Sequence, residues 1–572
     1  KFATLTVLIL LSIPLGGTTF AQSSISFDLK DVNGKRYSIS DFGDAKALVV
    51  AFVGTECPLV SLYAKRLQKL ADRFQSDGVS FIAINSNRQD SLSELQAFVR
   101  DHSIEFPLLK DPGNRVADHF GATRTPEVFL LNKAREIVYQ GTIDDQFNYG
   151  VQQKSAKNHY LRDAIKQYLN NTPIDISKTD PIGCLIGRQL KTDNNSTVSF
   201  HNQISRIFQK RCIQCHREGE LAPFALSDYD EVAGWASMIK EVIEDRRMPP
   251  WHAEAAPGHF KNDSRLTEQE KQLIFDWVDA GAPEGDPADA PAARQFAKDW
   301  QIGVPDQVIK MDSRPFKVPA NGIVDYKYFV VDPGFKEDKW IQAAECRPGN
   351  RAVVHHIIVG VKGMGEFGRN RSQALESEWI AATAPGAPPM VLPQGYAKLV
   401  PAGSKLIFQM HYTPNGTRQF DLSEIGLVFA KPDEVKKKVI TLMSHNDELR
   451  IPPGDDNYEI QSFKRIREDV ELLAMFPHMH YRGKKFKFEF KTPGGDFETL
   501  LDVPYYDFNW QNSYELARHR QLPKGTRVRC TAVFDNSEKN LSNPDPTRTV
   551  YWGDQTWDEM MIGYFDVAVD AN

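Results

Sequence analysis

The chain has 572 residues, of which 41% are hydrophobic and 11% aromatic, so it is globular in character but too long for a single core. Length alone suggests about three to five domains. The formal net charge of −6 excludes a basic nucleic-acid binder.

The N-terminus has the pattern of an export signal. Lys1 precedes an apolar run at 7–15, and Thr19-Phe20-Ala21 is a small-x-Ala cleavage site. We therefore expect residues 1–21 to be a signal peptide that is cleaved near Ala21; a buried N-terminal helix is the alternative. No stretch reaches the roughly 18 apolar residues that a membrane span needs. The expected protein is bacterial, periplasmic or secreted, and has no membrane span.

Residues 25–170 alternate strand and helix patterns. Buried strands are predicted at 47–53, 79–85 and 125–131, with helical stretches that end near Phe74 and Asp101. Such βαβ alternation is typical of an α/β domain whose helices cover a parallel or mixed sheet.

Cys57 directly follows the first long strand, where the next helix should begin. A helix N-terminus lowers the pKa of a thiol because it favours the thiolate. This placement, together with Thr125-Pro126, resembles the thioredoxin and peroxiredoxin superfamily, in which a cis-proline faces the reactive cysteine. The resemblance implies a redoxin domain at 25–170 with Cys57 as its catalytic residue.

Two departures limit this resemblance. Val60 stands where the second cysteine of a Cys-x-x-Cys would be, and Gly54 replaces the threonine that peroxiredoxins carry three positions before the cysteine. Cys184 is a candidate to resolve Cys57 as a disulfide. Active thiol chemistry and a retained docking module both stay open.

A haem-attachment motif follows a polar linker at 171–198. Cys212, Cys215 and His216 form Cys-x-x-Cys-His, the pattern that binds haem c through two thioethers with the histidine as axial ligand. A zinc site completed by His252 and His259 is the alternative.

Met248 is a candidate second axial ligand for the haem. It is followed by two prolines, which fix the loop around it, and a thioether ligand raises the potential of haem iron. His252 competes for this role, and a Met248 that only packs is a further alternative. Residues 199–285, with a helix at 267–280, resemble a small, mainly α-helical cytochrome c domain.

Beyond a second linker at 286–304, short β segments with frequent Gly and Pro predominate. This spacing predicts antiparallel sandwiches. Because residues 305–572 are too many for one sandwich, we expect two jelly-roll-like sandwiches in tandem, at 305–440 and 441–572.

Six soft or borderline metal ligands fall into two sets in this region. Thioether sulfur favours Cu(I), and imidazole serves both copper oxidation states. Residues two apart on a strand face the same side, so His478 and His480 can reach one ion. His355 and His356 are adjacent and would diverge on a regular strand; they share an ion only at a bend or bulge or through different ring nitrogens, or else one of them is structural. The sets are His355, His356 and His411, then His478, His480 and Met560.

The order and spacing of these ligands resemble the copper type II ascorbate-dependent monooxygenases, the class of peptidylglycine α-hydroxylating monooxygenase and dopamine β-hydroxylase. The resemblance covers roughly 305–572. It implies that the set of His478, His480 and Met560 holds the oxygen-binding copper. The set with His411 would hold an electron-transfer copper across a wet cleft.

The resemblance also implies which substrates are excluded. Peptide amidators have an arginine at the position of Phe476 and an asparagine at that of Ile562, whereas their tyrosine is retained as Tyr564, a candidate catalytic residue. Peptide amidation is therefore not expected, and a less polar substrate is favoured. Cys530 lacks its usual partner, for which Cys346 is a possible substitute.

The main expectation is thus an exported copper monooxygenase that hydroxylates a C–H bond of a small molecule with O2. Its cofactors would be two copper ions and one haem c that relays electrons from an external donor. The alternatives are a non-catalytic electron-transfer or copper-handling protein, and a thiol peroxidase or disulfide reductase that acts at Cys57.

Overall fold

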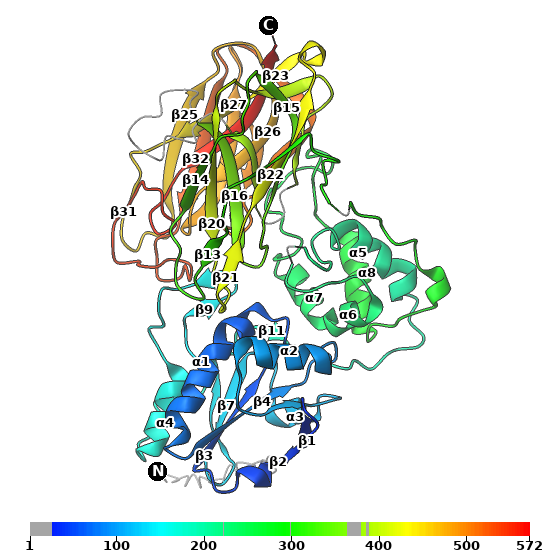
Figure 1. Cartoon of the computed structure of the whole chain (residues 1–572), viewed down its shortest axis with the longest axis vertical. Coiled ribbons are helices and arrows are strands. Elements are labelled where there is room, and N and C mark those ends of the chain that lie inside the picture. Colours follow the sequence, from blue (N-terminus) through cyan, green and yellow to red (C-terminus); the bar gives the residue numbers. More distant parts are fainter. Residues whose placement is uncertain (1–25, 221, 298, 363–378, 385–387, 572) are drawn as a thin grey trace, which may run out of the picture.

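The computed structural model describes residues 26–220, 222–297, 299–362, 379–384 and 388–571. It contains an α/β domain, a small helical unit and a large β-rich half (Figure 1). The predicted signal peptide lies outside the described residues. Among the described helices, none is both long and apolar enough to cross a membrane.

The first domain is built on a seven-stranded sheet with the order β2-β1-β5-β4-β3-β7-β8. Its central strands β3, β4 and β5 are parallel, and β7 joins β3 antiparallel. The strands are β1 (Asp28–Asp31), β2 (Arg36–Ser38), β3 (Ala47–Phe52), β4 (Val79–Asn85), β5 (Leu108–Lys110), β7 (Glu127–Leu131) and β8 (Ile137–Gly141). The helices are α1 (Pro58–Gln75), α2 (Leu92–His102), α3 (Arg115–Phe120) and α4 (Tyr160–Leu169).

β3 is buried along its whole length, which explains its unbroken apolar run. Alternate residues of this strand enter two different cores, one on each face of the sheet. The three predicted strands and both predicted helices of this domain are confirmed.

The predicted linker at 171–198 is partly a strand. β11 (Cys184–Leu185) pairs antiparallel with β6 (Arg124–Thr125), so that Cys184 lies opposite Thr125. This segment therefore belongs to the first domain, because its backbone completes a two-stranded ladder beside Pro126.

The helical unit consists of short helices around a core that contains Trp235 and Trp277, both almost fully buried. Segment 249–263 leaves this unit and packs on the β-rich half, where Trp251 and Phe260 join the core of the second sandwich. The helices are α5 (Ser205–Arg211), α6 (Tyr229–Gly234), α7 (Ala236–Glu244) and α8 (Glu268–Asp279).

Two sandwiches form the β-rich half, but they share one sheet. Strands β19 and β23 pair in parallel and join the first sandwich to the second within a nine-stranded sheet. The strands of this sheet are β12 (Gln307–Lys310), β15 (Lys339–Arg347), β18 (Met390–Val391), β19 (Tyr396–Val400), β22 (Glu424–Ala430), β23 (Lys437–His445), β26 (Val470–His478), β29 (Tyr514–Leu522) and β32 (Ile562–Asp570).

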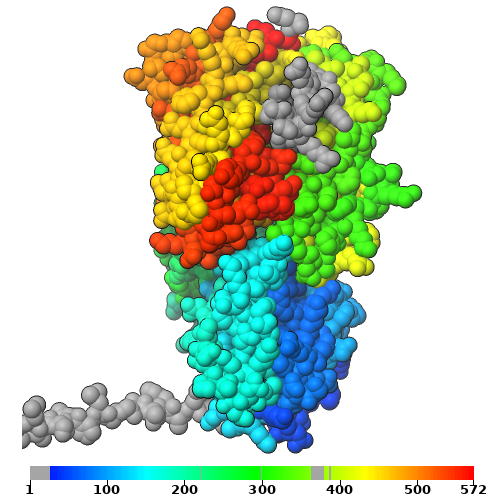
Figure 2. Space-filling view, turned by 90° about the vertical axis from the view of Figure 1, so that its left-hand side faces the viewer, coloured from blue at the N-terminus to red at the C-terminus, as the bar shows by residue number. Residues whose placement is uncertain are grey.

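A four-stranded sheet packs on each half of this shared sheet. One is β14 (Lys327–Val331), β16 (Val354–Lys362), β17 (Trp379–Thr383) and β20 (Lys405–Tyr412). The other is β25 (Tyr458–Arg465), β27 (Gly483–Lys491), β28 (Glu498–Val503) and β30 (Arg527–Phe534). Figure 2 shows the first domain, blue to cyan, directly against the β-rich half.

Candidate functional site

Cys57 is the N-cap residue of α1, and its side chain is fully buried. The peptide bond between Thr125 and Pro126 is cis, as the resemblance implies, and the Cys57 thiol lies 3.1 Å from the carbonyl oxygen of Thr125. The same strand pairing that places Cys184 opposite Thr125 brings the two thiols together.

These two thiols are hydrogen-bonded to one another and have different acidities. Burial by itself would raise the pKa of Cys57, but hydrogen bonds from Cys184 and from the backbone N–H groups of Val60 and Leu59 lower it to about 7. The hydrogen bond to Cys57 and burial raise the pKa of Cys184 well above its ordinary value. Cys57 is therefore the more acidic thiol of the pair, and Cys184 the less acidic one.

Buried polar atoms without partners occur in the same domain as this pair. The hydroxyls of Thr55 and Thr125 and the amide of Gln89 have no hydrogen-bond partner among the described residues. A buried polar group that stays unpaired costs about 1–3 kcal/mol. Such a set is expected where a small polar molecule binds.

Gly54 has a steric reason to replace the peroxiredoxin threonine. A Cβ atom at this position would lie 2.5 Å from Nδ2 of Asn87 and 3.2 Å from the hydroxyl of Thr125. A threonine at position 54 would require the side chain of Asn87 to shift, whereas Thr55 offers a hydroxyl one position later.

The comparisons with known proteins concern this first domain. The AhpC/TSA family matches residues 21–140. The thiol-disulfide oxidoreductase ResA of Halalkalibacterium halodurans is 27% identical over 146 residues, which are 23% of this chain and 81% of that protein. The chloroplastic peroxiredoxin Q of Populus jackii is 30% identical over 119 residues, which are 20% of this chain and 54% of that protein.

The first domain is a thioredoxin-like redoxin of the AhpC/TSA type. Among solved structures, a hypothetical protein from Sinorhizobium meliloti 1021 is 33% identical and covers 29% of this chain and 92% of its own, with a TM-score of 0.27. These matches involve less than a third of the chain, so they describe the redoxin domain and not the activity of the whole protein.

The helical unit packs directly on the redoxin domain beside Cys57. Nε1 of Trp235 lies 3.3 Å from a carboxylate oxygen of Glu56, and Arg124 forms a salt bridge to Glu241 at 2.7 Å. Burial, with a smaller contribution from nearby carboxylates such as Asp90, raises the pKa of Glu56 to about 7. The helical unit is thus in contact with the residue that directly precedes Cys57.

The Cys-x-x-Cys-His segment has features that fit a covalent haem. Both cysteines are free, and Nδ1 of His216 lies 3.1 Å from the carbonyl oxygen of Phe224. In the tautomer that donates to this oxygen, Nε2 remains available for iron. His259 instead contacts the carbonyl oxygen of Leu500 on the second sandwich, which argues against the zinc alternative.

Met248 and His252 line a cavity of about 1320 Å³ between the helical unit and the second sandwich. Arg211, which precedes the first cysteine of the motif, and Phe508 share its wall, whereas His216 does not. The structure therefore brings both candidate axial residues, Met248 and His252, to one cavity.

His355, His356 and His411 converge in the first sandwich. Nδ1 of His355 lies 3.3 Å from Nδ1 of His356 and 3.2 Å from Nδ1 of His411. Nitrogen ligands at about 2.0 Å from a tetrahedral metal ion are about 3.3 Å apart. The three side chains are also the group of potential metal ligands found among the described residues.

A β-bulge resolves the difficulty of two adjacent histidines on one strand. In the pairing of β16 with β20 the register shifts between Val354 and His356, so His356 lies opposite His411 and His355 is the extra residue. A bulge re-aims a side chain in this way. Burial lowers the pKa of His355 to about 4, so its ring is neutral and can ligate a metal.

His478 is the last residue of β26 and His480 lies two residues beyond the strand, with ring centroids 5.2 Å apart. Nδ1 of His478 contacts Gln511 at 2.7 Å, and Nδ1 of His480 contacts the carbonyl oxygen of Asp558 at 3.2 Å. These contacts orient the rings, and Nε2 of His480 is buried without a partner. Met560 is two residues from Ile562, which pairs with His478.

Tyr326 lies between the two histidine sets, which sequence reasoning did not indicate. Its ring centroid is 5.0 Å from that of His411 and 6.4 Å from that of His480. Its hydroxyl is buried and has no partner among the described residues. Phe508 also contacts both sets, so buried aromatic rings stand where the resemblance implies a wet cleft.

The remaining candidate residues of the β-rich half are Tyr564, Cys346 and Cys530. Tyr564 packs on Trp379 at 4.3 Å between ring centroids, beside Phe476. Cys346 and Cys530 are both free and lie in the cores of different sandwiches, so Cys346 does not replace the missing partner of Cys530.

Proposed function

We propose that this chain is an exported oxidoreductase whose redoxin domain reduces small hydroperoxides through Cys57 and Cys184. The hydrogen bond between the two thiols, one of low pKa and one of high pKa, is the observation that carries the proposal. The likeness of this domain to a peroxiredoxin and to a thiol-disulfide oxidoreductase supports it.

The reaction follows from the roles of the two thiols. The Cys57 thiolate attacks the O–O bond of a hydroperoxide, and with one proton this releases an alcohol or water and leaves a sulfenic acid on Cys57. The Cys184 thiol then condenses with the sulfenic acid, releases water and forms a disulfide. A small external thiol reduces this disulfide by exchange.

Burial favours a small substrate over a protein disulfide. Cys57 is 0% exposed. Trp235 of the helical unit donates a hydrogen bond to Glu56, the residue that precedes Cys57. The unpartnered hydroxyls of Thr55 and Thr125 are potential hydrogen-bond partners for a hydroperoxide, whereas a folded protein cannot reach a thiol that is 0% exposed.

Peroxide consumption by the full chain, with a small thiol as reductant, tests this proposal. We expect the C57S variant to lose the activity, and we expect C184S to accumulate a sulfenic acid that dimedone traps. A C57S variant that consumes peroxide at the wild-type rate would refute the thiol mechanism.

A second activity, a copper-dependent monooxygenase, is favoured by the convergence of three Nδ1 atoms in the first sandwich. His355, His356 and His411 would hold one copper ion, and His478, His480 and Met560 the other. Copper would supply one-electron redox chemistry and the reaction with O2. The overall reaction is R–H + O2 + 2 e⁻ + 2 H⁺ → R–OH + H2O.

The electrons would come from an external one-electron donor through the helical unit. Phe508 supports this route, because its ring is stacked on His355, with ring centroids 5.5 Å apart and an interplanar angle of 7°. The same ring lines the cavity beside Met248. We expect M248A to slow copper reduction by the donor; equally fast reduction in a haem-free variant would exclude the relay.

Metal analysis with EPR spectra of the purified chain tests the copper sites. Two type 2 coppers and one haem per chain are the expected result. Oxygen consumption coupled to a hydroxylated product separates a monooxygenase from a copper-handling or electron-transfer protein, which would bind the metals without forming a product.

A further inference from the structure

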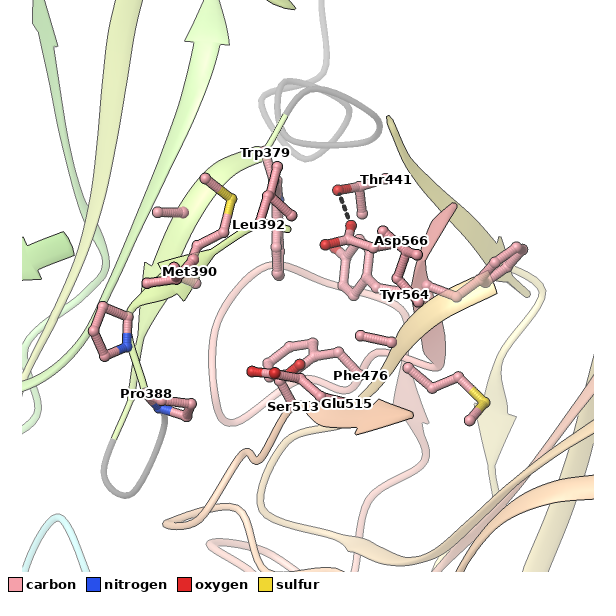
Figure 3. Close-up of a pocket in the computed structure, with 18 of the residues that line it drawn as sticks. Trp379, Pro388, Met390, Leu392, Thr441, Phe476, Ser513, Glu515, Tyr564 and Asp566 are labelled. Carbon is pink, nitrogen blue, oxygen red and sulfur yellow. Dashed lines mark hydrogen bonds between the residues drawn. The ribbon is translucent and has the colours of Figure 1, made fainter. Parts of the chain in front are cut away.

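A cavity of about 170 Å³ lies between the two sandwiches (Figure 3). Pro388, Met390 and Leu392 of the first sandwich stand on one side, and Phe476 and Tyr564 of the second stand on the other. For comparison, a cavity of about 150 Å³ engineered into another protein binds benzene. This cavity therefore has room for a molecule of about one ring.

The cavity adjoins both histidine sets. His356 of the first set is part of its wall, and so is Gln511, whose side chain contacts His478. A molecule in this cavity would therefore lie beside the residues that are proposed to hold copper.

The charged side chains of the wall are already paired. Lys398 is buried and contacts Asp566, the hydroxyl of Thr441 and the carbonyl oxygen of Trp379. At the other end, Glu515 is paired with Lys261 at 3.4 Å. Neither end offers an uncompensated charge to a carboxylate or an ammonium group.

Two polar atoms of the wall have no partner among the described residues, and one of them, Nε2 of His356, belongs to the histidine set that is proposed to hold copper. Nε1 of Trp379 is buried and has no hydrogen-bond acceptor among the described residues. The ring itself is held by Tyr564 and Phe476, with centroids 4.3 and 5.5 Å away. An indole N–H is a donor only, so an acceptor that enters the cavity beside it would satisfy it.

We propose that this cavity binds a small, neutral, mainly apolar molecule that carries one hydrogen-bond acceptor oxygen, which accepts from Trp379. The proposal rests on the copper monooxygenase for its catalytic meaning, since this molecule would be the substrate. Its binding does not depend on copper.

Calorimetric titration of the full chain with four ring compounds tests the proposal. Acetophenone has a ring and a neutral acceptor, ethylbenzene lacks the acceptor, benzoate adds a negative charge and benzylamine a positive one. We expect acetophenone to bind about tenfold more tightly than ethylbenzene, because one hydrogen bond to a buried donor has about that effect. Benzoate and benzylamine should bind more weakly than acetophenone.

The W379F variant keeps an aromatic ring and removes the donor. It should bind acetophenone about tenfold more weakly and leave ethylbenzene binding unchanged. W340F, in β15 and away from the cavity wall, is the matched control and should bind both as the wild type does. An unchanged acetophenone affinity in W379F, or tighter binding of either charged compound, would overturn the proposal.

Measurements with and without copper separate this proposal from the monooxygenase. Acetophenone binding that depends on Trp379 in both copper-free and copper-loaded protein supports the cavity. If the copper-loaded protein then gives no hydroxylated product with O2 and a reductant, the monooxygenase fails while the binding site stands. Absence of acetophenone binding in both states refutes the binding site itself.

Discussion

Trp235 of the helical unit donates a hydrogen bond to Glu56 of the redoxin domain, over a distance of 3.3 Å, and so connects two domains beside the reactive thiol. Its ring is also stacked on Phe224, with centroids 4.2 Å apart, and Phe224 accepts from His216. These contacts join the segment that carries the haem-attachment motif to the residue that precedes Cys57.

Replacing Trp235 with alanine should expose Cys57. We expect W235A to raise the rate of alkylation of Cys57 by a small maleimide at least tenfold, because the large buried side chain that is hydrogen-bonded to the neighbouring Glu56 is lost. W235F keeps the ring and should change the rate much less. The rate is measured by mass spectrometry of the modified peptide, and an unchanged rate in W235A would mean that Trp235 is not the cover.

Alkylation of Cys57 should depend on pH with a midpoint near 7. Because its pKa is lowered, the thiolate is present above about pH 7 and is lost as the pH falls through this value. In C184A the hydrogen bond from Cys184 is absent, so the midpoint should move upward. Glu56 also has a raised pKa of about 7. The side chain of the E56Q variant does not ionise, so the difference between its alkylation profile and that of the wild type is the part that Glu56 causes.

Adding a side chain at Gly54 should destabilise the redoxin domain. The Cβ atom of G54A would lie 2.5 Å from Nδ2 of Asn87, and overpacking of this kind costs about 1–3 kcal/mol. Chemical denaturation measures the loss. The double variant G54A/N87A should be less destabilised than the sum of the two single variants; strict additivity would show that the two side chains do not clash.

Removal of His411 should abolish one copper site and leave the other. We expect H411A to bind about one copper ion less per chain, because two histidines on neighbouring positions of β16 do not complete the set. H201A, in the helical unit, is the matched control. Copper content after dialysis against a weak chelator measures the difference, and full copper content in H411A would contradict the assignment.

Tyr326 carries a buried hydroxyl that has no hydrogen-bond partner among the residues that the structure describes. Y326F removes this hydroxyl and keeps the ring, so it should stabilise the metal-free protein by about 1 kcal/mol. Y326A removes the packing between the histidine sets and should destabilise it by about 3–5 kcal/mol. Denaturant titration measures both, and a destabilising Y326F would reveal a bond that the hydroxyl makes in solution.

The sequence by itself determined the local elements and the chemical types of the ligands. The unbroken apolar run of β3 predicts a buried strand because every side chain of it faces a core. The position of Cys57 after this strand likewise predicts a thiol at a helix N-terminus, and the spacing of His478 and His480 predicts rings on one side of the chain.

Only the tertiary structure decided which of these residues meet. Cys184 reaches Cys57 because the segment that the sequence predicts to be a polar linker contains a short strand. The sequence does not reveal this strand, because a two-residue ladder is too short to give a periodic pattern. His355 and His356 reach one point because β16 has a bulge, and bulges depend on the register of the partner strand. Trp235 and Tyr326 act across domain boundaries, and contacts between domains leave no trace in the periodicity of either segment.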